Sequence, residues 1–438
     1  MNSINGLLGP FLKTIAGNWN RRRQPQYRGR IYIEGIQNPV HIDRDSWGIP
    51  QIQAESRADL YFSQGFVHAQ ERLWQMEINR RAAKGELSAI LGRPGLETDR
   101  LTRTLGFKDL APRSWESMSQ RGREDVIAYT AGINAYLEGN HPLPIEFTLL
   151  RHRPAAWDPL DSVAFARLVM WTLSHGWAGE LTRARIIEQL GSDIAEILEP
   201  VYPKDRPVTL PDGIEFNRLQ LDGMMEAAAG PYLARGMEGA GRGSNGWVIS
   251  SSRSTSGHAL LANDVHLPIG TPALWYFSHL KQIGANEDLP ILDAAGVSLP
   301  GMPYILIGHN RHIAWGATLS YVDCEDLFVE RFHPDNHSRY LFDDEWLEAE
   351  IRQECIQVKG EPDHIEEVIT TRHGPVISKI IGAEDTALAL QSTAFIPEAC
   401  FEGIASLVDV RSWDAFVEAA ACIQSPSLNL VYADREDN

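Results

Sequence analysis

The chain has 438 residues, of which 43% are hydrophobic and 22% charged, a composition typical of a globular protein with one large domain or two ordinary ones. The formal net charge of −18 argues against general nucleic-acid binding, because no basic surplus is present to neutralise phosphates. The longest apolar runs are shorter than about 18 residues, so we expect no transmembrane helix. The four cysteines are far apart and contain no Cys-x-x-Cys pair, which disfavours a zinc knuckle or a dense disulfide framework.

The N-terminal residues 1–28 predict a loosely held tail whose basic run at 21–23 is a solvated segment or a local basic patch. This tail lacks the basic start and small-residue cleavage site of a signal peptide, so the sequence does not support export. Residues 30–34 and 40–44 alternate apolar and polar side chains, which predicts two strands, and 51–54 predicts a third.

A mostly helical region follows, and we expect it to extend over residues 29–218 as one unit. Ser56 is a suitable N-cap for a long helix that continues to about Arg81, and Gly85 marks its end. Further helical periodicity covers about 124–137 and 162–191, with a proline-rich connection between them. Residues 219–243 are small and weakly patterned, which predicts a spacer where the chain is open to cleavage.

Residues 244–438 change to strand periodicity, so helices come first and sheets second, which predicts an α+β fold. A helix is expected at 413–421. The predicted strands lie at 247–250, 259–262, 274–281, 302–307, 312–314, 327–332, 349–358, 366–371 and 386–391.

The junction between Gly243 and Ser244 has two interpretations. Ser244 is an ordinary turn serine, or it becomes a new N-terminus if the chain is cut after Gly243. In the second case its own α-amine, with a pKa of about 7.7–8.0, can activate the hydroxyl without a separate base. Gly243 suits such a cut, because glycine tolerates the strained backbone that brings the hydroxyl onto the preceding carbonyl.

Two further clusters carry candidate chemistry, each with a structural alternative. His266 follows a predicted strand and is a catalytic base, a group that positions the α-amine, a metal ligand or a hydrogen-bonded turn histidine. The acidic residues at 323–326 supply hard oxygen ligands that suit Ca²⁺, or they form a solvated turn. Turn-like residues at 308–310 and 315–319 are able to present a backbone N–H to an oxyanion.

Taken together in order, these segments resemble the penicillin acylase family of N-terminal-nucleophile (Ntn) amidohydrolases. The resemblance covers most of the chain. It rests on residues 44–50, 65–76, 80–85, 243–247, 261–267, 308–310, 313–318 and 323–326.

The resemblance implies a precursor that cuts itself before Ser244 and yields α and β chains around an αββα sandwich core. Ser244 is then the nucleophile that attacks the amide of a small N-acyl substrate and forms an acyl-enzyme. The resemblance places the Leu319 N–H and the Asn429 side chain in the oxyanion hole, and His266 near the α-amine. It also implies a structural Ca²⁺ ion bound by Glu180, Asp323, Asp326 and the carbonyl of Glu325.

Relatives in this family run several hundred residues further, so the resemblance implies a core that is incomplete at its C-terminal end. Asp437 stands where the family usually has glycine. The alternative function is that of an inactive, calcium-stabilised relative that binds or assembles, and a Ser-His-Asp hydrolase is disfavoured because no Gly-x-Ser-x-Gly elbow surrounds Ser244.

Overall fold

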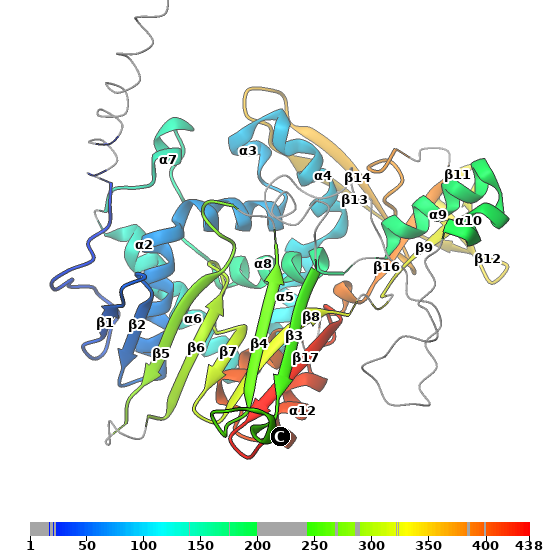
Figure 1. The fold of residues 1–438 in the computed structure, drawn as a ribbon. Coiled ribbons are helices and arrows are strands. Elements are labelled where there is room, and N and C mark those ends of the chain that lie inside the picture. The colour runs from blue at the N-terminus through cyan, green and yellow to red at the C-terminus, as the bar shows by residue number, and fades with distance from the viewer. Residues whose placement is uncertain are drawn as a thin grey trace, which may run out of the picture.

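The protein was analysed as a computed structural model. It describes residues 17, 21, 23–139, 141–174, 176–198 and 243–438, the last without 268–269, 285–289, 321, 323, 383–385 and 398–399. Most of the proposed spacer at 219–243 therefore lies outside the described residues. The fold is α+β, with a helical first part and a strand-rich second part, as the sequence predicts (Figure 1).

The helical layer is built on α2 (Arg57–Lys84), which begins and ends where its cap residues predict. The Ser56 hydroxyl accepts a hydrogen bond from the Asp59 N–H at 3.0 Å, and Gly85 adopts the left-handed conformation (φ 63°) that ends the helix. Helix α6 (Gln120–Glu138) crosses α2 so closely that a Cβ on Gly65 would lie 2.0 Å from the Tyr129 carbonyl oxygen. This crossing forms the centre of the hydrophobic core.

Besides α2 and α6, the described helices include α4 (Leu96–Leu105) and α5 (Phe107–Ser117), which the sequence did not predict because Gly92, Gly95 and Gly106 around them indicate loops. The helix predicted at 413–421 is confirmed as α12 (Trp413–Ala421). The others are α3 (Ser88–Leu91), α7 (Ile145–Leu149), α8 (Pro159–Thr172), α9 (Trp177–Leu190), α10 (Ser192–Leu198) and α11 (Cys400–Ser406).

The main sheet has seven strands in the order β1-β2-β5-β6-β7-β8-β17. Only β2 and β5 pair in parallel; the other described neighbours are antiparallel. One face packs on α2, where Tyr276, Ser278 and Leu280 of β5 are buried. The strands are β1 (His41–Arg44), β2 (Pro50–Ala54), β5 (Tyr276–Gln282), β6 (Leu292–Ser298), β7 (Ile307–Asn310), β8 (Ile313–Leu319) and β17 (Leu428–Asp434).

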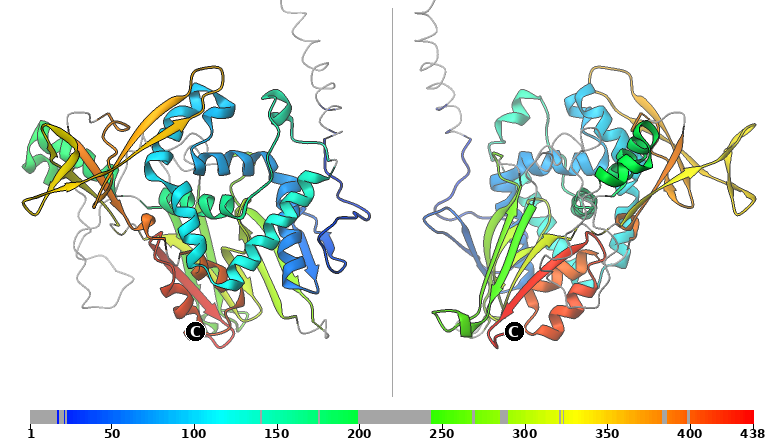
Figure 2. Two further views of the ribbon diagram at one scale, coloured as in Figure 1. Left: turned by 180° about the vertical axis from the view of Figure 1, so that it is seen from behind. Right: turned by 45° about the vertical axis from the view of Figure 1, so that its right-hand side comes forward.

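A second, two-stranded sheet of β3 (Gly243–Ile249) and β4 (Leu260–His266) lies against β8 and β17 of the main sheet. Two glycines allow this close approach: a Cβ on Gly246 would lie 3.2 Å from Val431, and one on Gly316 would lie 2.8 Å from the same side chain. Helices, main sheet and second sheet are thus three successive layers of the expected αββα order (Figure 2).

Smaller sheets extend to one side of the core (Figures 1 and 2); one of them contacts α9, and another packs against α4. They contain β9 (Glu325–Glu330) with β16 (Ala387–Ser392), β10 (Phe332–His333) with β11 (Asn336–Phe342) and β12 (Glu345–Glu348), and β13 (Glu350–Ile356) with β14 (His364–Thr371) and β15 (Gly374–Pro375).

Two strand predictions are wrong. Residues 30–34 form no strand: they lie between Gly29 and Gly35, both at positive φ, and no described strand pairs with them. Ile31 and Ile33 pack against the hydrophobic core while Tyr32 is 89% exposed, so the apolar alternation reflects packing without a hydrogen-bonded neighbour. The strand predicted at 302–307 starts only at Ile307, and residues 302–306 form a buried loop instead. The buried apolar side chains that suggested a strand contact α2 and α6 from this loop.

None of the helices that the structure describes combines the length and the apolar character needed to span a bilayer.

Candidate active site

Ser244 is the second residue of β3 and is partly buried at the end of the second sheet. Its hydroxyl Oγ donates a hydrogen bond to the carbonyl oxygen of Gly243 at 2.6 Å. The chain is continuous here, so the nitrogen of Ser244 belongs to a peptide amide and has no base function. The hydroxyl therefore lies next to the Gly243–Ser244 peptide bond, whose cleavage would free the Ser244 nitrogen as an α-amine.

His266 is the last residue of β4 and is the register partner of Gly243, one step from Ser244. Its ring is so near Gly243 that a Cβ there would lie 3.6 Å from His266 Nδ1. The other ring nitrogen, Nε2, is 2.8 Å from Asp264 Oδ2, and both side chains are exposed. The imidazole thus has a carboxylate partner and lies beside the residue that precedes the candidate nucleophile.

Leu319 and Asn429 lie on the neighbouring strands β8 and β17, one residue apart in the antiparallel register. The Asn429 Nδ2 donates to Thr318 Oγ1 at 3.2 Å and to the Leu319 carbonyl oxygen at 3.3 Å. The Ser320 N–H donates to the Ser427 carbonyl oxygen at 3.2 Å, so these two residues form a hydrogen-bonded pair. In an antiparallel ladder, hydrogen-bonded residue pairs alternate with pairs that exchange no hydrogen bond, and the next pair here is Leu319 with Leu428. The N–H of Leu319, in the intervening pair, consequently points away from β17.

Asn263 on β4 joins these two halves, although the sequence argument gave it no role of its own. Its Nδ2 donates to the Asn245 carbonyl at 2.9 Å and to the Ala317 carbonyl at 3.2 Å. Its Oδ1 accepts from the Ala317 N–H at 3.0 Å. The Asn263 side chain thereby links β3 to β8 through hydrogen bonds to Asn245 and Ala317, two residues before Leu319. Its place in the motif at 261–267 was the available signal, but its partner strand was not evident from sequence.

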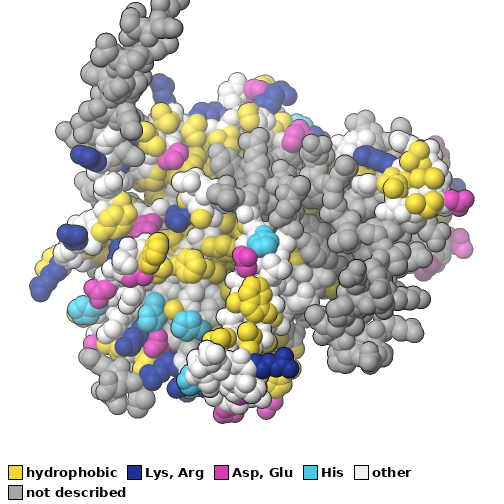
Figure 3. All heavy atoms as spheres, viewed as in Figure 1, with side chains coloured by type: hydrophobic (Ala, Val, Ile, Leu, Met, Phe, Trp, Pro, Cys, Tyr) yellow, Lys and Arg dark blue, Asp and Glu magenta, His cyan; other side chains and the backbone are white. Residues whose placement is uncertain are grey.

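The surface around β3 and β4 is rich in exposed hydrophobic side chains, which gather on the face shown in Figure 3. Trp247 on β3 is 51% exposed, and Phe277 on β5 is 56% exposed. Side chains alternate along a strand, so Trp247 lies on the face of β3 opposite to that of Ser244.

The residues expected to bind calcium are partly brought together at the start of β9. Glu180 of α9 accepts from the Leu327 N–H at 2.8 Å, which places its carboxylate beside Asp326. Glu325 is buried, and its carboxylate accepts from the Gly176 N–H at 3.2 Å and from Ser392 Oγ at 3.1 Å, whereas Asp326 is exposed on the opposite face of the strand.

Asp323 lies outside the described residues. Among the residues that the structure does describe, no three His, Cys, Asp or Glu side chains form a group able to hold a metal ion. Calcium binding stays a prediction.

Comparison with known proteins decides the family. Residues 39–438 match the family model described as penicillin amidase. The chain belongs to the penicillin amidase family. The penicillin acylase 2 proenzyme of Pseudomonas sp. (strain SE83) is 34% identical to it over 377 residues, which are 85% of this chain and 47% of that protein. The acyl-homoserine lactone acylase QuiP of Pseudomonas aeruginosa is 31% identical over 436 residues, 94% of this chain and 50% of that protein.

The chain spans about half the length of these curated relatives of the penicillin amidase family. Among solved structures, a thermostable penicillin G acylase from Alcaligenes faecalis matches with 26% identity and a TM-score of 0.38, over 44% of this chain and 33% of that one.

Proposed function

We propose that this chain is a self-processing amidohydrolase in which cleavage after Gly243 converts Ser244 into an N-terminal nucleophile. The observation that carries the proposal is the contact between Ser244 Oγ and the Gly243 carbonyl oxygen, at the start of a strand paired with His266. Membership of the penicillin amidase family supports it, as does the word "proenzyme" in the name of one relative.

The self-cleavage is an acyl shift within the chain. Ser244 Oγ attacks the carbonyl carbon of Gly243, its proton passes to the departing nitrogen, and the C–N bond breaks to leave an ester and a free α-amine. Water then hydrolyses the ester, which gives a Gly243 carboxylate and restores the serine hydroxyl. His266 would relay the proton, and its position beside Gly243 and its contact with Asp264 support this role.

The freed α-amine then serves as the general base in substrate hydrolysis. It takes the Oγ proton as Ser244 attacks the substrate carbonyl, and it returns a proton to the leaving amine as the acyl-enzyme forms. Water releases the acid and regenerates the enzyme. Leu319 N–H and Asn429 Nδ2 donate to the oxyanion, and the loss of one such donor typically slows catalysis by about 10²–10³.

The substrate is an N-acyl compound with an apolar acyl group, of the β-lactam side-chain or acyl-homoserine lactone type. The two relatives reported above are named for these two substrate classes.

A structural Ca²⁺ ion belongs to the same proposal. Glu180, Asp323 and Asp326 would supply carboxylate oxygens, and Glu325 its carbonyl, at the junction of α9 and β9. Oxygen ligands on a loop are the set that Ca²⁺ prefers. Calcium should raise the unfolding temperature of the chelator-treated chain, and Asp326→Asn should reduce that rise. An equal rise in chain and variant, or none in either, would remove calcium from the proposal.

Intact-mass spectrometry of the purified chain tests the self-cleavage. We expect the wild type and Ser244→Cys to give two fragments, the products of cleavage between Gly243 and Ser244. Ser244→Ala should give a single uncut chain. Ser252→Ala, which removes an exposed serine outside the junction, is the matched control and should be cut. An uncut wild type with the same mass pattern as Ser244→Ala would disprove self-processing in this chain.

Hydrolysis is tested separately, with a chromogenic phenylacetyl anilide and with an N-acyl-homoserine lactone. Turnover of either substrate by the cut chain, absent in Ser244→Ala, is the expected result. Clean cutting and folding with no turnover of any N-acyl amide would instead favour an inactive, calcium-stabilised binding protein.

A further inference from the structure

Thr318 lies where the two sheets meet, next to both residues that the resemblance places at the oxyanion. It precedes Leu319 on β8 and is the register partner of Asn429 on β17. Partners in an antiparallel ladder carry their side chains on the same face of the sheet, so the side chains of Thr318 and Asn429 are neighbours. The Asn429 amide nitrogen Nδ2 donates to the Thr318 hydroxyl Oγ1 at 3.2 Å.

The face that carries these two side chains is directed at the second sheet. A Cβ on Gly246 of β3 would lie 3.2 Å from Val431 Cγ1, and Val431 follows Asn429 by two residues on the same face of β17. The same Cβ would lie 3.5 Å from the Thr318 methyl Cγ2. The methyl group thus packs under Gly246, which follows Ser244 by two residues on the same face of β3.

The packing of the methyl group determines where the hydroxyl points. Threonine is branched at Cβ, so its methyl and hydroxyl groups turn together about χ1, which has few allowed rotamers. Contact of the methyl with β3 therefore keeps the Thr318 hydroxyl on the Asn429 amide. Serine at this position would lack the methyl group, and valine would lack the hydroxyl.

The two N–H hydrogens of the Asn429 amide have different acceptors. One hydrogen bond goes to Thr318 Oγ1, and the other goes to the Leu319 carbonyl oxygen at 3.3 Å. The N–H and C=O of one residue in an antiparallel ladder point to the same side, and those of Leu319 point away from β17. An oxyanion on the Leu319 N–H would therefore lie beside the Leu319 carbonyl oxygen. One Asn429 hydrogen can pass from that carbonyl to the oxyanion while the other stays on Thr318.

We propose that Thr318 is a positioning residue whose hydroxyl holds the Asn429 amide across β8, with one N–H beside the oxyanion position at Leu319. This role rests on the proposed function, in which Asn429 Nδ2 and the Leu319 N–H donate to the oxyanion. Thr318 acts only through Asn429 and does not touch the substrate. A donor that is held in place before the reaction stabilises the developing charge without first having to reorganise.

Steady-state hydrolysis of the phenylacetyl anilide by the cut chain tests this role with three variants at position 318. Thr318→Val keeps the shape and loses the hydroxyl, so kcat should fall roughly 3–10-fold, the effect of one hydrogen bond, while KM changes less than about twofold. Thr318→Ser keeps the hydroxyl and should retain most of the wild-type kcat, and Thr318→Ala should resemble Thr318→Val. A purely structural role would give the opposite order, with valine closest to the wild type.

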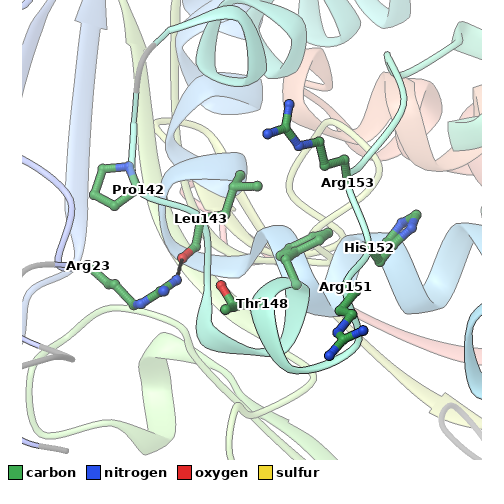
Figure 4. A pocket seen from close by; sticks show the side chains of 8 residues that line it. Arg23, Pro142, Leu143, Thr148, Arg151, His152 and Arg153 are labelled. Atoms are coloured by element: carbon green, nitrogen blue, oxygen red, sulfur yellow. Dashed lines mark hydrogen bonds between the residues drawn. The ribbon is translucent and has the colours of Figure 1, made fainter.

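Thr148→Val is the matched control. Thr148 is an exposed threonine of α7 that lines a hollow on elements other than β8 and β17 (Figure 4). This variant should keep the kcat and KM of the wild type. Thr318→Val should also fold, because Asn429 is exposed and water can replace the lost acceptor, and an unfolding temperature equal to that of Thr148→Val checks this.

A second measurement needs no turnover. In the uncut Ser244→Ala chain, labelling of asparagine with nitrogen-15 reports the Asn429 side-chain amide by NMR, and the signals are assigned by their loss in Asn429→Ala. Thr318→Val should shift these amide proton signals and speed their exchange with water, since one acceptor is gone. Thr318→Ser should restore the signals toward the wild type, and Thr148→Val should leave them unchanged.

The role of Thr318 is overturned if the wild type hydrolyses the anilide and Thr318→Val does so with the same kcat, or if valine at this position is more active than serine. It is also overturned if the Asn429 amide signals are the same in Thr318→Val and Thr148→Val. A wild-type chain that is not cut, or that is cut and hydrolyses no substrate, would refute the proposed function instead. The amide signals would then decide by themselves whether Thr318 positions Asn429.

Discussion

Asn263 gives the sharpest test of how the candidate site is held together. Replacing it with alanine removes three hydrogen bonds, two from Nδ2 to the carbonyls of Asn245 and Ala317 and one from the Ala317 N–H to Oδ1. Each such bond contributes about 0.5–1.5 kcal/mol net, so Asn263→Ala should lower the free energy of unfolding by roughly 2–4 kcal/mol.

Aspartate at this position has a different and pH-dependent effect. The aspartate keeps an oxygen that accepts from the Ala317 N–H, but its second oxygen faces the carbonyl oxygens of Asn245 and Ala317, to which the Nδ2 of Asn263 donates in the wild type. Near neutral pH the charged side chain is repelled, so Asn263→Asp should be less stable than Asn263→Ala. A protonated carboxyl can donate, which raises its pKa in the folded state, so this deficit should shrink as the pH falls through that raised pKa.

Urea unfolding followed by circular dichroism measures these differences. Every variant should carry Ser244→Ala as well, so that all molecules have one covalent structure. Asn336→Ala, which loses two exposed hydrogen bonds that Asn336 Oδ1 accepts from Ser338 on β11, is the matched control and should change stability by less than about 1 kcal/mol. If Asn263→Ala is as stable as this control, Asn263 does not join the two sheets.

Three further predictions concern the helical layer. Gly65→Ala places a Cβ 2.0 Å from the Tyr129 carbonyl oxygen and should leave little soluble protein, whereas Gly270→Ala, with 3.6 Å to its nearest atom, should express normally. Burial lowers the pKa of His68 to about 3, so at acidic pH the unfolded chain binds a proton that the folded chain does not. The free energy of unfolding should therefore fall as the pH drops below about 6.5, by about 2 kcal/mol at pH 5. In His68→Gln the fall measured by urea unfolding should be smaller by that amount, and an equal pH dependence in variant and wild type would contradict the prediction. Asp99→Ala leaves the N–H groups of Leu87 and Ser88 without their buried acceptor and should cost about 2–4 kcal/mol in urea unfolding, and a loss no larger than that of the exposed Asp335→Ala would refute this.

The elements best predicted from sequence are those whose ends carry their own signals. Helix α2 has Ser56 at its start and Gly85 at its end, and its hydrogen-bonded caps lie within the local sequence. Strand β6 was missed because Leu292–Ser298 is rich in alanine and contains Gly296, with no β-branched run. It is a strand because β5 and β7 pair with it on both sides, and Gly296 admits the Ile307 carbonyl at a place where a Cβ would lie 2.1 Å away.

The candidate site shows the same division. The order of motifs along the chain suggested Ser244 and His266, which lie in the segments 243–247 and 261–267, whereas Leu319 and Asn429 came from the family resemblance, and the roles of all four residues stay predictions. What the order does not contain is register. Only the pairing of β8 with β17 shows that the Leu319 N–H points away from the ladder, and only the contact of β4 with β8 reveals Asn263.

The β3–β4 register is consistent with both stages of the proposed function. Before cleavage it holds Gly243 opposite His266 and keeps the Gly243 carbonyl on Ser244 Oγ. After cleavage, Gly243 would no longer be joined to Ser244, but pairing from Ser244 onward would persist because Ser244 is the partner of Val265. The new α-amine, which is the former amide nitrogen of Ser244, would then lie at the start of β3, next to the space that Gly243 had filled. One fixed ladder would thus align the peptide bond to be cut and afterwards position the base that the cut creates.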